Sequence, residues 1–344
     1  MRFAVIGSLG WAGSRHVEAL AEMGQDIVAL VDPGAGCVEQ AAAIGAKAVA
    51  SFDDLDLDTI DAATLALPPS LHPELTRRLA RAGKHVMCEK PMAPDSAEAL
   101  ALVEFAKSVP VTIMPGYLLR TNPHIRGFLD ALRGMGQLRR VHLSTNVRKP
   151  SMAGWRSEPV IGGALLVNAI HQIDLATWFV GETLTPRFAQ LDNVHFEAPT
   201  EDLFFTSLAS PSGVTATILS SWSPRPPICD DGLMITDAGR LRIEAETDEG
   251  SIILTGTGYR RNGEDVALPG VVGVNQFVKE LEHFIDAIET GAPLWVTVED
   301  NWKVQKLIED CGADQRPVGI GLGHGEGDLE RLGIDRLHRR HVGE

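Results

Sequence analysis

Two polar side chains far apart in the sequence have the chemistry to bind and deprotonate an alcohol. The first, Lys90, follows an apolar segment and precedes Pro91, whose ring restricts the backbone of both residues. An ammonium held there could hydrogen-bond a reacting oxygen and stabilise negative charge as an alkoxide forms. The alternative is a surface lysine paired with Glu89. We prefer the first interpretation because Lys90 lies at the carboxyl end of a predicted strand, where ligands bind in parallel sheets.

The second side chain, His171, lies on a polar stripe of a predicted helix around residues 165–179. Asn168, His171 and Asp174 are spaced three residues apart, so a helix brings them to one side. A histidine whose second nitrogen is held by a carboxylate suits a general base near neutral pH. We therefore predict Lys90 and His171 as catalytic residues, supported by Asp174 and Asn168. A structural histidine–aspartate pair fits the spacing equally well. A metal site is a weak interpretation, because His171 and Asp174 supply only two ligands and no third lies within reach.

A glycine-rich turn near the N-terminus could bind the pyrophosphate of a dinucleotide. Three glycines lie between a predicted strand over 3–6 and a predicted helix. Glycines in such a turn let backbone N–H groups approach a phosphate at the helix N-terminus. The strict GxGxxG spacing is absent, so a plain structural turn is the alternative. The predicted cofactor-binding residues of this turn are Gly7, Ser8, Leu9, Gly10, Trp11, Ala12 and Gly13.

Asp32 ends the second predicted strand and could accept hydrogen bonds from the adenosine ribose. Its charge would repel a 2′-phosphate, and residues 33–39 contain no Arg or Lys to offset that repulsion. We therefore expect NAD, with NADP less favoured. The alternative is that Asp32 merely caps a loop before Pro33. Residues at two further strand ends complete the predicted cofactor crevice: Leu67, Pro68, His72, Glu89 and Lys90.

Four residues are predicted to contact the substrate. Tyr117 and Arg120 lie at the junction between two predicted domains, and Trp155 and Arg156 precede the helix that carries His171. A core position fits Trp155 equally well.

The order of elements indicates the fold. The first 120 residues alternate short apolar runs with helical periodicity, which predicts an α/β, doubly wound Rossmann domain over 1–121. Over 122–311, strands that alternate apolar and polar residues indicate a C-terminal α+β domain with a large, mostly antiparallel sheet. Glycines alternate from residue 319 onwards, so we interpret 312–344 as a flexible, Gly-rich tail.

The composition favours a small-molecule partner. Acidic residues number 46 against 31 basic ones, for a formal charge of -15, which opposes binding to nucleic acid or an anionic membrane. The chain contains no long apolar run and no cleavable leader pattern. Its four cysteines form no CxxC pair, so we expect reduced thiols, a cytoplasmic location and no thiolate zinc site.

Together these motifs resemble those of the Gfo/Idh/MocA oxidoreductase family. The resemblance implies an NAD(P)-binding Rossmann domain and a C-terminal domain whose open sheet often mediates oligomers. It also implies redox chemistry on sugars, cyclitols or related hydroxyl compounds, with Lys90 as the active-site lysine and His171 as the base. The matching elements are the N-terminal turn, Pro68-Pro69 with His72, Cys88-Glu89-Lys90-Pro91, Gly116-Tyr117, Gly162-Gly163, His171 with Asp174, and the helix from Phe277.

One position departs from the family pattern. Many members with inositol-type chemistry carry an aspartate four residues before the histidine, where this chain has Val167. We therefore expect an NAD-dependent dehydrogenase of a sugar, cyclitol or related polyol, assembled as a homodimer or homotetramer, without a defined substrate. Two alternatives remain open. One is a dinucleotide-binding sensor without turnover, and the other is an enzyme that uses a tightly bound NAD only transiently.

Overall fold

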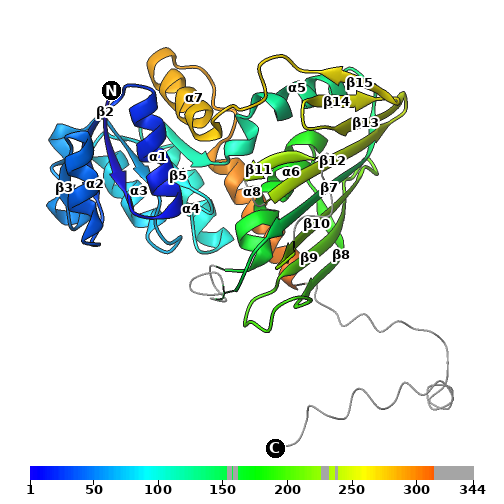
Figure 1. The fold of residues 1–344 in the computed structure, drawn as a ribbon, viewed down its shortest axis with the longest axis horizontal. Helices are drawn as coiled ribbons and strands as arrows, with labels where there is room; N and C mark the ends of the chain where they lie inside the picture. The colour runs from blue at the N-terminus through cyan, green and yellow to red at the C-terminus, as the bar shows by residue number, and fades with distance from the viewer. Residues whose placement is uncertain (153–156, 158–161, 226–231, 237–238, 314–344) are drawn as a thin grey trace, which may run out of the picture. The chain divides into compact units, whose positions relative to one another are not determined.

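The structure is a computed structural model that describes residues 1–152, 157, 162–225, 232–236 and 239–313. Within these residues the chain forms two sheets (Figure 1). None of the described helices combines the length and the apolar character that crossing a bilayer requires.

The first sheet of the described chain has six parallel strands in the order β3-β2-β1-β4-β5-β6. The order reverses between β1 and β4, which is the switch point where doubly wound sheets bind dinucleotides. The strands are β1 (Arg2–Ile6), β2 (Asp26–Val31), β3 (Lys47–Val49), β4 (Ala62–Leu65), β5 (His85–Glu89) and β6 (Ile113–Gly116).

Helices cover both faces of this sheet. Phe3 and Val5 of β1 pack with α1 and α2, whereas Ala4 and Ile6 pack with α3 and α4, because successive side chains of a strand point to opposite faces. The predicted Rossmann domain is thereby confirmed. The helices are α1 (Trp11–Glu22), α2 (Gly36–Ile44), α3 (His72–Arg81) and α4 (Ser96–Ala106), with 3₁₀ turns at Phe52–Asp54, Leu57–Thr59 and Leu118–Arg120.

The second sheet is mostly antiparallel, as predicted. Its order is β15-β14-β13-β12-β7-β10-β9-β8, with β11 beside β12. Among the described strand pairs of this second sheet, only β7 and β10 are parallel. The strands are β7 (Leu138–Arg148), β8 (Thr185–Asp192), β9 (Leu203–Ala209), β10 (Thr215–Ser223), β11 (Leu233–Thr236), β12 (Gly239–Thr247), β13 (Gly250–Leu254), β14 (Gly258–Arg261) and β15 (Glu264–Ala267).

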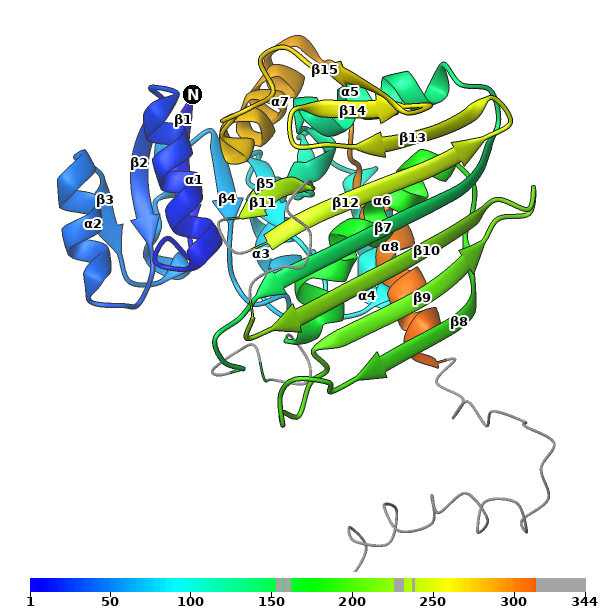
Figure 2. The same cartoon turned by 45° about the vertical axis from the view of Figure 1, so that its right-hand side comes forward.

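Helices pack against one face of this second sheet (Figure 2). The contacts join α6 to β7 and β10, α8 to β8, and α5 to β13 and β14. Along β9, buried residues alternate with half-buried ones, which is the pattern of a sheet covered on one face. The helices are α5 (Pro123–Arg133), α6 (Ile170–Val180), α7 (Gln276–Thr290) and α8 (Val298–Ala313), and a π-helical segment over Leu165–Ala169 precedes α6.

The last two described helices return to the first sheet. Contacts join α7 to α1, and α8 to both α4 and β6. The side chain of Asn275 accepts a hydrogen bond from the N–H of Phe277, as expected for the predicted helix cap. The domain boundaries proposed from the sequence remain predictions, and residues 314–344 of the predicted tail lie outside the described chain.

Candidate active site

The glycine turn lies between β1 and α1, and its glycines are sterically required. A Cβ on Gly7, which has a φ of 84°, would lie 2.3 Å from the carbonyl oxygen of Ala66. A Cβ on Gly13 would lie 2.0 Å from the carbonyl oxygen of Gly7. Gly10 is the N-cap of α1, so the unsatisfied N–H groups of the first helical turn lie at this loop. Gly7 and Gly13 are therefore required by the close packing of the turn against its own backbone and that of Ala66.

Other residues of the turn differ in what they can offer a ligand. Leu9 and Trp11 are 40% and 60% exposed, and Trp11 and Ala12 begin α1. The side chain of Ser8 is fully buried beside Cys37, so only the main chain of Ser8 can reach a cofactor.

Asp32 lies beside the turn at the end of β2. Its carboxylate accepts hydrogen bonds from the N–H of Leu9 at 3.2 Å and from the N–H of Gly34 at 2.9 Å. These two bonds fix the carboxylate next to the loop, where the predicted contact with the ribose requires it.

His72 joins the ends of two strands. Its Nε2 accepts from the N–H of Leu67 at 3.3 Å, and its Nδ1 lies 2.8 Å from the carbonyl oxygen of Pro91. A neutral imidazole satisfies both contacts, since it donates from one nitrogen and accepts at the other. Burial lowers the pKa of His72, which favours this neutral form. His72 therefore shapes the crevice beside the exposed Pro68 without needing to contact a ligand.

Lys90 reaches from the end of β5 to the segment that precedes α6. Its Nζ donates to the main-chain carbonyl of Val167 at 3.0 Å, and a cis peptide bond joins Lys90 to Pro91. Burial lowers the pKa of Lys90, and the carboxyl groups of Glu89 and Glu280 oppose part of that decrease. The contact with Val167 places the ammonium beside the helical segment that carries His171.

The surroundings of His171 favour its neutral ring. Burial, and secondarily the charge of Lys90, lower its pKa well below the ordinary value, so its ring is neutral at pH 7. The ring packs edge-on against Tyr117, with centroids 6.1 Å apart. The Nδ1 atom is buried and has no hydrogen-bond partner among the described residues. Lys90 and His171 thus come together as predicted.

Asp174 does not support His171, which corrects the sequence-based prediction. Its oxygens accept from Nε of Arg120 at 3.0 Å and from Nη2 at 2.7 Å, and the two side chains are 1% and 3% exposed. His171 and Asp174 are three residues apart on α6 and point about 60° apart, and the guanidinium of Arg120 takes the carboxylate of Asp174. Asn168, in the π-helical segment before α6, accepts instead from Nε1 of Trp222 at 2.7 Å.

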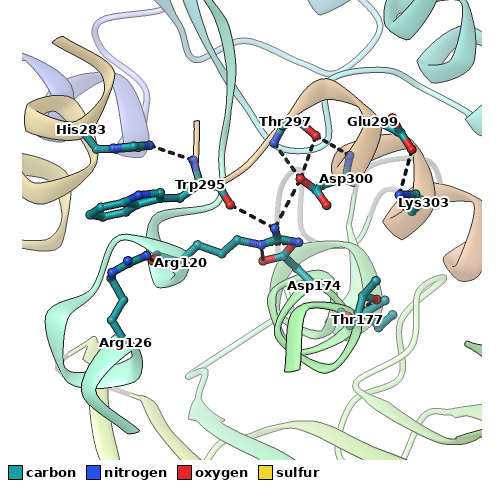
Figure 3. A network of polar contacts seen from close by, with 11 residues as sticks. Arg120, Arg126, Asp174, Thr177, His283, Trp295, Thr297, Glu299, Asp300 and Lys303 are labelled. Atoms are coloured by element: carbon teal, nitrogen blue, oxygen red, sulfur yellow. Dashed lines mark hydrogen bonds and ion pairs between the residues drawn. The ribbon is translucent and has the colours of Figure 1, made fainter. Parts of the chain in front are cut away.

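Arg120 is also not available to a substrate, contrary to the prediction. Besides Asp174, its guanidinium lies 3.4 Å from Asp300 and donates to the carbonyl of Trp295 at 3.2 Å (Figure 3). Burial raises the pKa of Asp174 to about 6, although Arg120 limits the increase. The predicted contact between Arg120 and a substrate is therefore wrong, because the guanidinium already binds Asp174 of α6 and Asp300 of α8.

The remaining predicted substrate residues have mixed outcomes. Tyr117 is fully buried, and its hydroxyl donates to Oδ1 of Asn301 at 3.2 Å. Its ring, not its hydroxyl, is therefore what lies next to His171. Trp155 and Arg156 fall outside the described residues.

Sequence patterns did not reveal a buried group of three ionisable side chains, one of which is Glu89, predicted above only as a cofactor-binding residue. His16 of α1, Glu89 of β5 and Glu280 of α7 place one nitrogen or oxygen atom each within 4.8 Å of one another. We call them the His16–Glu89–Glu280 cluster. A signal was available, since Glu280 lies three residues after Phe277 and four before Phe284, on the apolar side of α7.

Two family models match the chain. The model described as an oxidoreductase family with an NAD-binding Rossmann fold matches residues 1–117, and the model described as a GFO/IDH/MocA C-terminal domain matches residues 133–253. Together they match more than half of the chain.

Curated relatives include inositol 2-dehydrogenases. The chain is 29% identical over 333 residues to that of Rhizobium meliloti (strain 1021), an alignment that covers 93% of this chain and 99% of the relative. It is also 29% identical over 181 residues to that of Leifsonia xyli subsp. xyli, where the alignment covers 51% of this chain and 52% of the relative.

Solved structures share the fold. The myo-inositol 2-dehydrogenase of Lactobacillus plantarum aligns with a TM-score of 0.75 at 22% identity, over 91% of this chain and 96% of the other. GenD2 from gentamicin A biosynthesis, in complex with NAD, aligns with a TM-score of 0.76 at 20% identity, over 92% and 95%. At these identities the likeness concerns the fold.

Proposed function

Because the chain belongs to the Gfo/Idh/MocA family of NAD-binding oxidoreductases, we propose that it transfers a hydride between NAD and a hydroxyl-bearing carbon of a cyclitol, sugar or related polyol. The observation that carries this proposal is the meeting of Lys90 and His171. Lys90 lies at the carboxyl end of β5 and binds the carbonyl of Val167, next to the helix that carries His171. In a doubly wound sheet this edge faces the dinucleotide.

The residues present fit NAD. Gly10 caps α1, so the unsatisfied N–H groups of the first helical turn are available to a pyrophosphate, and Asp32 lies fixed beside the turn. When bound, NAD supplies the nicotinamide carbon that takes or gives the hydride. We assign Asp32 to the adenosine ribose, where its charge would disfavour NADP.

In the direction of oxidation, His171 takes the proton of the substrate hydroxyl, for which it must be neutral. Lys90 donates a hydrogen bond to the same oxygen and stabilises the charge that develops on it. An ammonium has three N–H donors, and within the described chain only the carbonyl of Val167 is bonded to one of them. A positioned base of this kind contributes about 10²–10⁴-fold in rate.

The test is an absorbance screen for NADH over cyclitols, sugars, sugar acids and hydroxy acids. We expect one class to be oxidised, with a loss of roughly 100-fold or more in Lys90→Ala and in His171→Ala. Lys107→Ala is the matched control, because Lys107 is an exposed lysine paired with Glu104 on α4. Activity that survives both active-site substitutions would refute the site. NAD binding without turnover on any class would favour the sensor.

The proposal also includes a cytoplasmic enzyme that assembles as a homodimer or homotetramer through the second sheet. Half-buried apolar rings on that sheet support an interface, since Phe188 and Phe205 lie 5.9 Å apart on neighbouring strands. Light scattering should give a mass of two or four chains for the wild type and a smaller mass for Phe205→Glu. A monomeric wild type would contradict this part of the proposal.

A further inference from the structure

The His16–Glu89–Glu280 cluster joins three distant segments beneath Lys90. His16 and Glu280 are fully buried and Glu89 is 7% exposed. Nε2 of His16 lies 3.3 Å from Oε1 of Glu89, and Oε2 of Glu89 accepts from the main-chain N–H of Lys90 at 3.2 Å. The cluster therefore connects the cofactor helix α1, the strand end that carries Lys90, and α7 from the last part of the described chain.

The two carboxyl groups of the cluster differ in their surroundings. Neither oxygen of Glu280 has a hydrogen-bond partner among the described residues. Burial, together with the charge of Glu89, raises the pKa of Glu280 well above the ordinary value, which favours its protonated form. Burial also tends to raise the pKa of Glu89. The hydrogen bond and charge of His16, with the charges of Lys90 and His72, exceed that effect, so the pKa of Glu89 is lowered. These surroundings favour a carboxylate at Glu89 and a carboxylic acid at Glu280.

The charges around Lys90 follow from this difference. Burial disfavours the ammonium form of Lys90, and the acids that favour it are Glu89 from β5 and Glu280 from α7. His171 from α6 is neutral, and Val167 offers only a carbonyl. With Glu280 protonated, the charge that stabilises the ammonium is that of Glu89.

We propose that His16, Glu89 and Glu280 are positioning residues that hold Lys90 as an ammonium ion, with the charge on Glu89 and the proton on Glu280. The inference deepens the proposed function, on which it rests. In this arrangement the negative charge of Glu89 offsets the positive charge of Lys90. Because His16 belongs to α1, the same cluster also ties the cofactor helix to the strand end that carries Lys90.

A divalent cation is the other use of one imidazole and two carboxylates. We favour a proton on Glu280 over a bound cation for two reasons. His16 and Glu280 are fully buried, and the ammonium of Lys90 acts on both carboxyl groups and would repel a cation.

The test measures the pKa of Lys90 without using turnover. Trace acetylation of the full-length protein over a range of pH, followed by peptide mass spectrometry, reports the midpoint at which the Lys90 amine becomes reactive. The exposed Lys47 serves as the internal standard. We expect Glu89→Gln to lower the midpoint by at least about 1 pH unit, which is a tenfold change in the ratio of amine to ammonium. Glu280→Gln should leave it unchanged, because one neutral group replaces another.

Several outcomes would overturn the proposal. An unchanged midpoint in Glu89→Gln would do so, as would a Glu280→Gln shift as large as that of Glu89→Gln. One equivalent of bound metal in the wild type, lost in Glu280→Gln, would show a cation site instead. If Glu89→Gln does not fold, the infrared carbonyl band of a protonated carboxylic acid at mildly alkaline pH decides the matter. That band should be present in the wild type and missing in Glu280→Gln, and its absence from the wild type would refute the proposal.

The acetylation result also separates this proposal from the proposed function. A midpoint that moves in Glu89→Gln, in a protein that oxidises no polyol, would leave the cluster intact and refute the dehydrogenase. Where turnover is found, the alkaline limb of its pH profile should move in Glu89→Gln by the same amount as the midpoint. A purely structural role of Glu89 would lower the rate without moving that limb.

Discussion

Replacing Asp174 by alanine should destabilise the protein by about 3 kcal/mol, because removing one partner of a buried ion pair costs about 3–5 kcal/mol. Arg120 would remain 3% exposed, with its charge no longer matched by the acid that it contacts most closely. Asp300 lies 3.4 Å from the same guanidinium and is 24% exposed, so it offsets part of the loss. We therefore expect a value at the lower end of the range.

The assay is equilibrium unfolding of the full-length protein in urea, followed by tryptophan fluorescence. Glu104→Ala is the control, because it removes one partner of an exposed pair with Lys107 that water already screens. The double substitution of Arg120→Met with Asp174→Leu should recover most of the lost stability, since apolar side chains of similar volume can replace a buried pair.

Two results would refute this reasoning. A loss in Asp174→Ala no larger than that in Glu104→Ala would show that the buried pair is not what stabilises the contact between α6 and α8. A displaced acid limb in the pH profile of Asp174→Asn would show that Asp174 does act on His171. We expect that limb to stay where it is in the wild type, because Asp174 bonds to Arg120.

Three further predictions concern the site. On the acid side, activity should fall only below pH 6.5, because burial and the charge of Lys90 lower the pKa of His171 from that value. Residual activity in Lys90→Ala should therefore show an acid limb at higher pH, and an unmoved limb would argue that the two residues are not coupled. Gly13→Ala should weaken NAD binding by about tenfold or more in calorimetry, because the new Cβ would lie 2.0 Å from the carbonyl oxygen of Gly7 and displace the turn. A tenfold loss of affinity corresponds to only about 1.4 kcal/mol. Gly256→Ala, with nothing within 4 Å, is the control, and equal affinity in both variants would contradict the prediction. Asn168→Ala should cost about 1–3 kcal/mol in urea unfolding because it leaves the buried indole N–H of Trp222 unsatisfied. Full stability of that variant would show that another acceptor takes over.

Local patterns predicted the first sheet well. The strand over residues 3–6, the glycine turn and the following helix are signalled by neighbouring residues alone, and the structure places them as expected. The helix α8 was not predicted, because Asn301 and Gln305 interrupt its apolar face. Both side chains are buried, where Asn301 accepts from the hydroxyl of Tyr117 and Gln305 donates to the carbonyl of Ala93. The two side chains also bond to each other, since Nδ2 of Asn301 donates to Oε1 of Gln305 at 2.7 Å. Tyr117 and Ala93 lie far away in the sequence, so spacing within the helix could not reveal that both polar side chains are buried.

The candidate site shows the same division. Motifs singled out Lys90 and His171, and the structure places the Lys90 ammonium on the carbonyl of Val167, in the segment that leads into the helix of His171. Their catalytic role stays a prediction. The predicted partner of Asp174, His171, was wrong. The carboxylate bonds to Arg120 instead, and that choice depends on the tertiary position of a guanidinium 54 residues away in sequence. Periodicity identifies the residues on a helix face but does not identify the neighbour that each residue meets.

The return of α7 to α1 has a consequence for biosynthesis. The ribosome completes the strands of the first sheet early, but Phe277, which packs against both Trp11 and His16, emerges much later. Until then the nascent chain presents that side of α1 to water or to a chaperone. Final maturation of the cofactor-binding end of the molecule therefore waits for translation to pass residue 290.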